Sequence, residues 1–151
     1  MRIVGVSIAG LNRISFRFRF GEHLIMSQPL RLVVADDDNA MAHYYGRMVP
    51  HWGHVLVAVV SNGRELVESC LQLRPDLVVS DIEMPELDGI SAMERVQCEI
   101  DIPFIFVSGN DREKHLKRLR RGHVLDFLQK PVDQSEFSFA LRNASAARAA
   151  S

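Results

Sequence analysis

The stretch Leu77-Val78-Val79-Ser80-Asp81-Ile82-Glu83-Met84-Pro85 decides the fold of this chain. Its apolar start does not alternate with polar residues, which is typical of a strand buried on both faces of a parallel sheet. One carboxylate, that of Asp81, follows the apolar run, and Pro85 then interrupts the chain. Functional groups of such sheets lie just beyond the carboxyl ends of the strands. We therefore predict that Asp81 lies at this edge, together with the side chains that follow the other strands.

Four more apolar runs have the length and composition of strands, and a helical pattern follows each strand. The predicted strands are 30–35, 55–60, 76–81, 104–107 and 124–128. Cap residues stand where helices would begin, at Asn62, Asn110 and Asp133, and Pro50 with Gly53 stands where the first helix would end. The alternation of strands and helices predicts a single parallel sheet with right-handed crossovers.

Length and composition exclude several classes of protein. The chain has 151 residues, 47% of them hydrophobic and 25% charged, which fits one globular domain with a sizeable core. Its formal net charge of -1 gives no overall field that would favour nucleic acid or an anionic membrane. The basic run 114–121 has no interleaved aromatic residues, which indicates a solvated helix face or a surface for an acidic partner. No apolar run reaches the ~18 residues of a membrane helix, and no signal peptide is evident. We expect a cytoplasmic protein with neither membrane nor nucleic acid as a partner.

The first 28 residues differ from the rest of the chain. The segment 14–20 alternates apolar and charged residues, as an edge strand would, but nothing beside it offers a partner. Met26-Ser27-Gln28 followed directly by a strand resembles a natural protein start, so we interpret 1–28 as an extension that is poorly ordered or dispensable. We place the globular domain at 29–147 and a tail at 148–151. We also expect fraying from Asn143 onward, because the sequence there is small and rich in alanine.

Polar side chains follow four of the predicted strands. Asp36 and Asp37 follow the first, Asp81 the third, Ser108 the fourth and Lys130 the fifth. Three crowded carboxylates repel one another unless a cation lies among them. Mg²⁺ fits because it binds a few carboxylates and keeps several waters. Lys130 adds a compact positive charge that suits a phosphoryl oxygen or a carboxylate.

This set of groups is suited to phosphoryl transfer. A carboxylate can attack phosphorus and form an aspartyl phosphate if metal and lysine neutralise the phosphoryl oxygens. Asp81 stands alone on its strand and is the candidate nucleophile, whereas the pair Asp36 and Asp37 would hold the ion. Taken singly, the acidic run could be a helix cap and Ser108 a turn residue. Their common position at strand ends favours a site.

Together, the motifs resemble the receiver (response-regulator) domain of two-component signalling over about residues 30–144. The resemblance rests on motifs that occur in the family's order and spacing: Ala35-Asp36-Asp37, Ser80-Asp81-Ile82-Glu83-Met84-Pro85, Asp88-Gly89, Ser108-Gly109 and Asp126-Phe127-Leu128-Gln129-Lys130-Pro131. It implies a flavodoxin-like (βα)5 fold, doubly wound around five parallel strands, and a stand-alone receiver of the single-domain type. Such a domain is no enzyme beyond catalysing its own phosphorylation and dephosphorylation.

The resemblance also implies the phosphoacceptor and the metal ligands. Asp81 would accept a phosphoryl group from a phosphohistidine on a sensor histidine kinase or a histidine phosphotransfer protein. Mg²⁺ would be bound by Asp37 and Asp81 directly, by Asp36 through water, and by the backbone carbonyl of Glu83.

The resemblance implies a switch as well. Ser108 and Lys130 would bind the phosphoryl oxygens, and Phe127 would turn inward when Ser108 moves toward the phosphate. The signal would leave through the fourth helix, fifth strand and fifth helix, toward an unidentified downstream protein or toward a second copy in a homodimer. Two departures bear on this surface. Phe127 lacks the hydroxyl of the commoner Tyr, and segment 122–126 is one residue longer than usual.

Two rival hypotheses stay open from the sequence. One is a binding module of the same fold that works without phosphorylation, which the intact set of site residues disfavours. The other is a phosphatase with an Asp nucleophile. That enzyme needs a second Asp two residues later as general acid, where this chain has Glu83.

Overall fold

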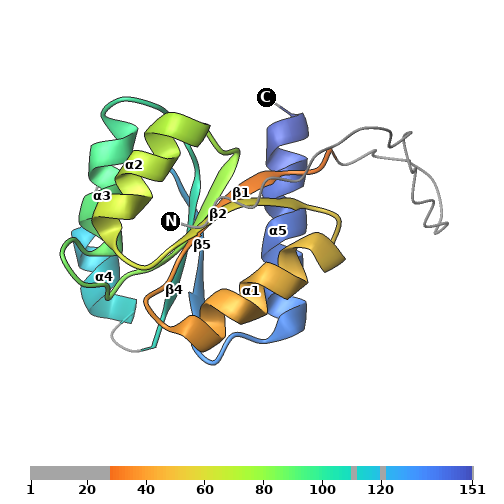
Figure 1. Cartoon of the computed structure of the whole chain (residues 1–151), viewed down its shortest axis with the longest axis horizontal. Coiled ribbons are helices and arrows are strands. Elements are labelled where there is room, and N and C mark those ends of the chain that lie inside the picture. Colours follow the sequence, from red (N-terminus) through yellow and green to blue (C-terminus); the bar gives the residue numbers. More distant parts are fainter. Residues whose placement is uncertain (1–27, 110–111, 120–121, 151) are drawn as a thin grey trace, which may run out of the picture.

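Five parallel strands form one sheet in the order β2-β1-β3-β4-β5 (Figure 1). The computed structural model describes residues 28–109, 112–119 and 122–150, so the segment 1–27 and the expected cap Asn110 lie outside it. The strands are β1 (Arg31–Ala35), β2 (Val55–Val60), β3 (Leu77–Asp81), β4 (Phe104–Ser108) and β5 (Val124–Gln129). Every neighbouring pair is parallel, and β3 and β4 are buried along their whole length. The five predicted strands are therefore confirmed.

Helices cover both faces of the sheet (Figure 1). One face carries α2 (Gly63–Leu73), α3 (Gly89–Gln97) and α4 (Arg112–Arg118); the other carries α1 (Asn39–His51) and α5 (Gln134–Ala149). A parallel sheet covered in this way is the doubly wound, flavodoxin-like architecture that the sequence predicts. None of the helices among the described residues is both long and apolar enough to cross a bilayer.

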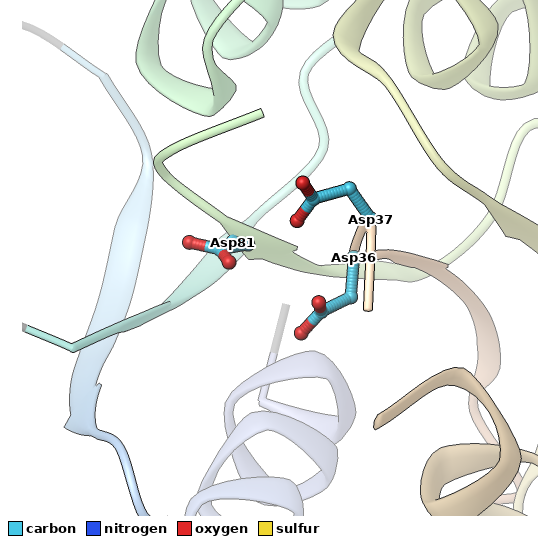
Figure 2. A group of neighbouring side chains, drawn as sticks. All are labelled: Asp36, Asp37 and Asp81. Carbon is cyan, nitrogen blue, oxygen red and sulfur yellow. The ribbon is translucent and has the colours of Figure 1, made fainter. Parts of the chain in front are cut away.

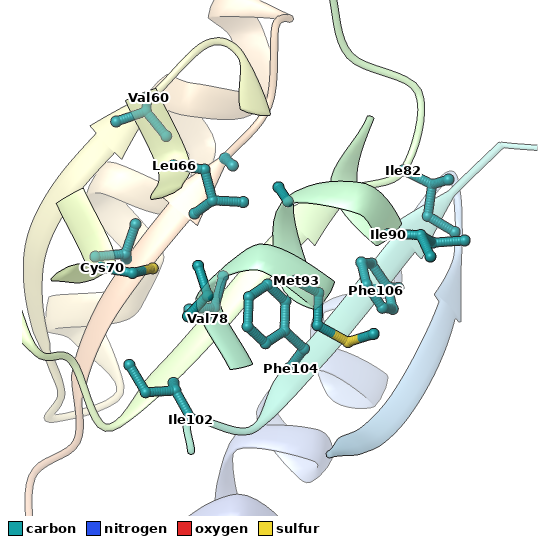
Figure 3. Packing of buried hydrophobic residues seen from close by; sticks show 14 of the residues in the cluster. Val60, Leu66, Cys70, Val78, Ile82, Ile90, Met93, Ile102, Phe104 and Phe106 are labelled. Atoms are coloured by element: carbon teal, nitrogen blue, oxygen red, sulfur yellow. The ribbon is translucent and has the colours of Figure 1, made fainter. Parts of the chain in front are cut away.

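Two apolar clusters fill the layers between helices and sheet. The first joins α2 and α3 to the sheet and includes Leu66, Met93 and Phe106 (Figure 3). The second joins α1 and α5 to the opposite face, and three aromatic rings run through it. Phe137 lies between Tyr45 and Trp52, with ring centroids 5.3 and 5.2 Å away. Burial of these side chains is the main force that holds helices on the sheet.

The helix caps follow the predicted chemistry. The Asn62 side chain accepts the N–H of Glu65 at 2.9 Å, and the Asp133 side chain accepts the N–H groups of Ser135 and Glu136. Such contacts satisfy N–H groups that have no partner inside the helix. The Glu65 carboxylate reaches back to the N–H of Ser61, one residue before the cap.

Helix α1 ends at His51, between Pro50 and Gly53 as the sequence predicts, and the N–H of Trp52 bonds back to the carbonyl of Met48 at 3.1 Å. The predicted end of the last helix is wrong. Helix α5 does not fray from Asn143 but continues to Ala149. Small side chains there pack against the sheet instead of loosening the helix, since Ala144 and Ser145 are buried.

The extra residue predicted in segment 122–126 has a structural counterpart in β5. Phe104 pairs with Val124 and the next residue, Ile105, pairs with Asp126, which leaves Leu125 unpaired as a bulge. The bulge exposes Leu125, whose side chain belongs to the apolar residues at the surface. The bulge lies at the start of β5, which is an edge strand, and the carboxyl end of β5 leads to Lys130.

Candidate functional site: an acidic cluster with one lysine

The end of β1 supplies two carboxylates of different character. Asp36 extends the sheet by one bond, because its N–H donates to the carbonyl of Val60 at 3.0 Å. Its side chain is only 1% exposed, and one carboxylate oxygen accepts the N–H of Asp38 at 3.0 Å. Asp37 is exposed. The buried carboxylate is thus fixed by the backbone, whereas its neighbour faces solvent.

The end of β3 places Asp81 beside Lys130. The Nζ atom of Lys130 lies 2.6 Å from Oδ2 of Asp81 and 3.0 Å from Oδ2 of Asp36. The other oxygen of Asp81 accepts the N–H of Glu83 at 3.0 Å. Lys130 itself is held where β5 ends, because its N–H donates to the carbonyl of Ser108 at 2.9 Å. Residues 36, 81, 108 and 130, predicted from strand ends, therefore meet at one edge of the sheet.

Burial and charge act on the ionisable groups in opposite directions. Burial is the largest influence on Asp36 and raises the pKa of its carboxyl above the ordinary value, and the charge of Asp81 adds to this. The N–H of Asp38 and the ammonium of Lys130 offset part of that rise. Partial burial by itself lowers the pKa of Lys130, but its contacts with Asp81 and Asp36 raise it above the ordinary value overall. The lysine is therefore a fixed positive charge at neutral pH.

The cluster has the donors that a hard divalent cation requires. One carboxylate oxygen from each of Asp36, Asp37 and Asp81 lies within 4.8 Å of the others (Figure 2). All of these donors are oxygens, and the exposed Asp37 leaves the outer side open for water ligands. The predicted set of carboxylates therefore fits Mg²⁺ by the chemistry of its donors. Glu83, the fourth predicted ligand, points its side chain to solvent and would contribute only through its backbone.

The two predicted switch residues lie on neighbouring strands. Ser108 is buried at the end of β4, and Phe127 pairs with Phe106 across β4 and β5. Phe127 is 9% exposed, and its ring centroid is 5.5 Å from that of Phe106. The aromatic ring thus already packs into the first apolar cluster.

The loop after Asp81 is fixed by contacts that sequence reasoning did not identify. Asp88 caps α3 by accepting the N–H groups of Ile90 and Ser91, and the guanidinium of Arg118 in α4 binds the same carboxylate at 3.1 Å. A Cβ atom at Gly89 would lie 2.2 Å from the carbonyl oxygen of Asp81, so only glycine permits this approach. The Asp-Gly pair was visible in the sequence as a motif, but its contact with α4 carried no sequence signal.

Comparison with known proteins places the sequence in a family. The family model of the response regulator receiver domain matches residues 32–142. A protein-glutamate methylesterase/protein-glutamine glutaminase of Haloarcula marismortui is 35% identical over 109 residues, 70% of this chain and 29% of that protein. A protein of the same name from Syntrophomonas wolfei is 37% identical over 108 residues, 69% of this chain and 30% of its own length.

Solved structures lead to the same family. The response regulator domain of Thermotoga maritima CheB is 26% identical, with a TM-score of 0.71 over 79% of this chain and 98% of that one. The signal receiver domain of the response regulator NarL of Mycobacterium tuberculosis has the same fold at 23% identity and a TM-score of 0.71, over 79% of this chain and 98% of that domain. This chain belongs to the response regulator receiver domain family, a family of two-component signalling. It spans about a third of the length of the curated relatives described above, so the esterase activity in their names is not transferred to it.

Proposed function

We propose that this chain is a receiver that accepts a phosphoryl group on Asp81 from a phosphohistidine of a histidine kinase or phosphotransfer protein. The observation that carries the proposal is the position of Asp81, with Lys130 Nζ at 2.6 Å and the oxygens of Asp36 and Asp37 within 4.8 Å of its own. A lone carboxylate beside a fixed cation and a metal-binding pair can attack phosphorus, while the attacked phosphoryl oxygens are neutralised. Membership of the receiver family supports the same chemistry.

In this reaction a carboxylate oxygen of Asp81 forms a bond to phosphorus as the bond from phosphorus to the imidazole nitrogen breaks. The electron pair of that bond returns to the imidazole, which takes a proton from solvent. Asp37, Asp81 and the carbonyl of Glu83 would hold Mg²⁺ directly and Asp36 would hold it through water, and the ion supplies positive charge for the phosphoryl oxygens. Lys130 moves its contact from the carboxylate to a phosphoryl oxygen, and Ser108 donates its hydroxyl to another.

The response is a change of binding surface along α4, β5 and α5. Ser108 ends β4 and leads toward α4, and Phe127 packs on Phe106 behind it, so a shift of Ser108 changes the packing beneath this surface. The surface carries exposed apolar side chains on α4 and β5, Leu116 and Leu125, which a partner would cover. The occupant is a downstream protein or a second copy of the chain.

Phosphorylation of Asp81 is tested with a small phosphodonor, such as acetyl phosphate, and Mg²⁺. We expect one acid-labile phosphate per chain, detected by intact mass, and none in Asp81→Asn. Glu99→Gln, which neutralises an exposed carboxylate outside the cluster, is the matched control and should be phosphorylated normally. Phosphate on the Asp81→Asn variant, or repeated turnover of the donor as an ester substrate, would contradict the proposal and favour another acceptor or a phosphatase.

A further inference from the structure

A buried tyrosine of α1 has a polar group that the fold leaves without a partner. Tyr45 is 1% exposed and packs between Tyr44 and Phe137 in the second apolar cluster. Its hydroxyl oxygen has no hydrogen-bond partner among the residues that the structure describes. Burying an unpaired hydroxyl is unfavourable, and phenylalanine would fill the same space without that cost. The packing of the ring therefore does not explain the hydroxyl.

Asp36 of the acidic cluster lies on the face of the sheet against which Tyr45 packs. Because Asp36 continues the β1 ladder, the alternation of side chains places it on the same face as Val34, which belongs to the second cluster with Tyr45. Burial raises the pKa of the Tyr45 hydroxyl, and the charges of Asp36 and Asp81 raise it further. The hydroxyl consequently keeps its proton and is a potential donor beneath the site.

The partner that this donor could serve is one oxygen of Asp36. Oδ1 of Asp36 accepts the N–H of Asp38, whereas Oδ2 forms an ion pair with Lys130 at 3.0 Å and has no further hydrogen-bond partner among the described residues. Lys130 shares its ammonium between Asp36 and Asp81 at rest. If that ammonium turns to a phosphoryl group on Asp81, Oδ2 of the almost fully buried Asp36 loses its direct ion-pair partner, because Asp36 would reach Mg²⁺ only through water. An unpaired buried charge is far more costly than an unpaired hydroxyl.

We propose that Tyr45 is a positioning residue whose hydroxyl donates to Oδ2 of Asp36 once Lys130 has turned to the phosphoryl group. The hydroxyl then fixes the position of the Asp36 carboxylate, directly or through one buried water, in the phosphorylated state alone. This inference rests on the proposed function, because it needs Lys130 to change partners. It implies that Tyr45 is unfavourable at rest and favourable after phosphorylation, so its presence shifts the balance toward the phosphorylated form.

The variant Tyr45→Phe separates these two effects. Without divalent ions, we expect its Tm to rise by roughly 2–4 °C, because an unpaired buried hydroxyl is removed. With beryllofluoride and Mg²⁺ as the phosphoryl mimic, we expect about tenfold weaker binding by calorimetry, the loss of one hydrogen bond to a charged group. Tyr44→Phe removes the hydroxyl of the half-buried neighbour in the same helix and should change neither quantity.

The possible outcomes distinguish a failure of the role of Tyr45 from a failure of the proposed receiver function. If wild type does not bind beryllofluoride, the receiver function itself fails. If wild type binds and Tyr45→Phe binds equally well, the function stands and the role of Tyr45 is refuted. A Tyr45→Phe variant that loses stability at rest would also refute it, because the hydroxyl would then already have a partner.

Discussion

At the scale of single residues, the site depends on keeping Asp36 charged where burial favours the neutral form. Its side chain is 1% exposed, and the ammonium of Lys130 compensates its charge at 3.0 Å. The same lysine also compensates Asp81, so two carboxylates depend on one cation in the resting protein. This shortage of positive charge explains why the cluster fits a divalent ion. It also explains why the carboxylates lower the stability of the folded protein when no ion is bound.

This shortage of positive charge predicts that neutralising Asp36 raises the thermal stability of the protein, by an amount that depends on pH. In EDTA at pH 7, we expect Asp36→Asn to raise Tm by about 2–4 °C, since the folded state disfavours the ionised form. The folded pKa of Asp36 is raised, so wild type regains this stability as pH falls through that pKa, and the difference should vanish near pH 4 and below. Thermal unfolding of both proteins between pH 4 and 8 measures it, with Glu99→Gln as the charge control. A difference that stays constant across this range would show that burial of the charge is not the cause.

At the scale of elements, the contact between α3 and the end of β3 fixes the geometry around the phosphoacceptor. The N–H of Gly89 donates to the carbonyl of Ile82 at 2.9 Å, and the absent side chain lets the helix start directly against the backbone of Asp81. Gly46 in the middle of α1 has no comparable neighbour within 4 Å of a built Cβ. Gly89 is therefore required by its surroundings, whereas Gly46 has room for a side chain.

Alanine at each of these glycines should have opposite effects. Gly89→Ala forces a methyl group to 2.2 Å from the Asp81 carbonyl oxygen, so we expect a loss of about 1–3 kcal/mol or more and weakened phosphorylation. Gly46→Ala should stabilise by up to about 1 kcal/mol, because alanine favours a helix interior. Urea unfolding gives both values. Equal stability of wild type and Gly89→Ala would mean that the α3 contact is looser than the structure indicates.

At the scale of the whole molecule, the strands and the acidic cluster were predictable because both depend on patterns local to each strand. Parallel strands end at one edge, so Asp36, Asp81 and Lys130 could be brought together without knowing any distance. Contacts between helices could not be predicted in this way. The pairing of Arg118 with Asp88 depends on the rotation of α4, and the burial of His115 in that helix has no sequence signal.

The ends of the chain show the same division. On the N-terminal side, the first residue that the structure describes is Gln28, and its carbonyl accepts the Ser145 hydroxyl at 3.2 Å. Arg148, which the sequence predicts to lie in the tail, belongs to α5 and binds Asp76 at 2.8 Å. Helix ends of this kind depend on distant partners and not on local composition.

We propose that the segment before Met26 is dispensable for folding and phosphorylation. A chain that starts at Met26 retains Gln28 and its bond to Ser145, so we expect its Tm to lie within about 2 °C of the full chain and its phosphorylation to be unchanged. Differential scanning fluorimetry and intact mass after acetyl phosphate treatment measure both. As a control, a chain that starts at Leu30 loses the Gln28 carbonyl and should be less stable. A large loss on removing 1–25 alone would assign this segment a structural role.

The row of aromatic rings through the second cluster gives the protein a native optical reporter. The chain contains a single tryptophan, Trp52, and its ring rests on Phe137, which in turn rests on Tyr45 beneath the acidic cluster. A rearrangement around Tyr45 can therefore alter the surroundings of the only indole. Its emission would follow events at the far end of α1 in real time, with no dye attached.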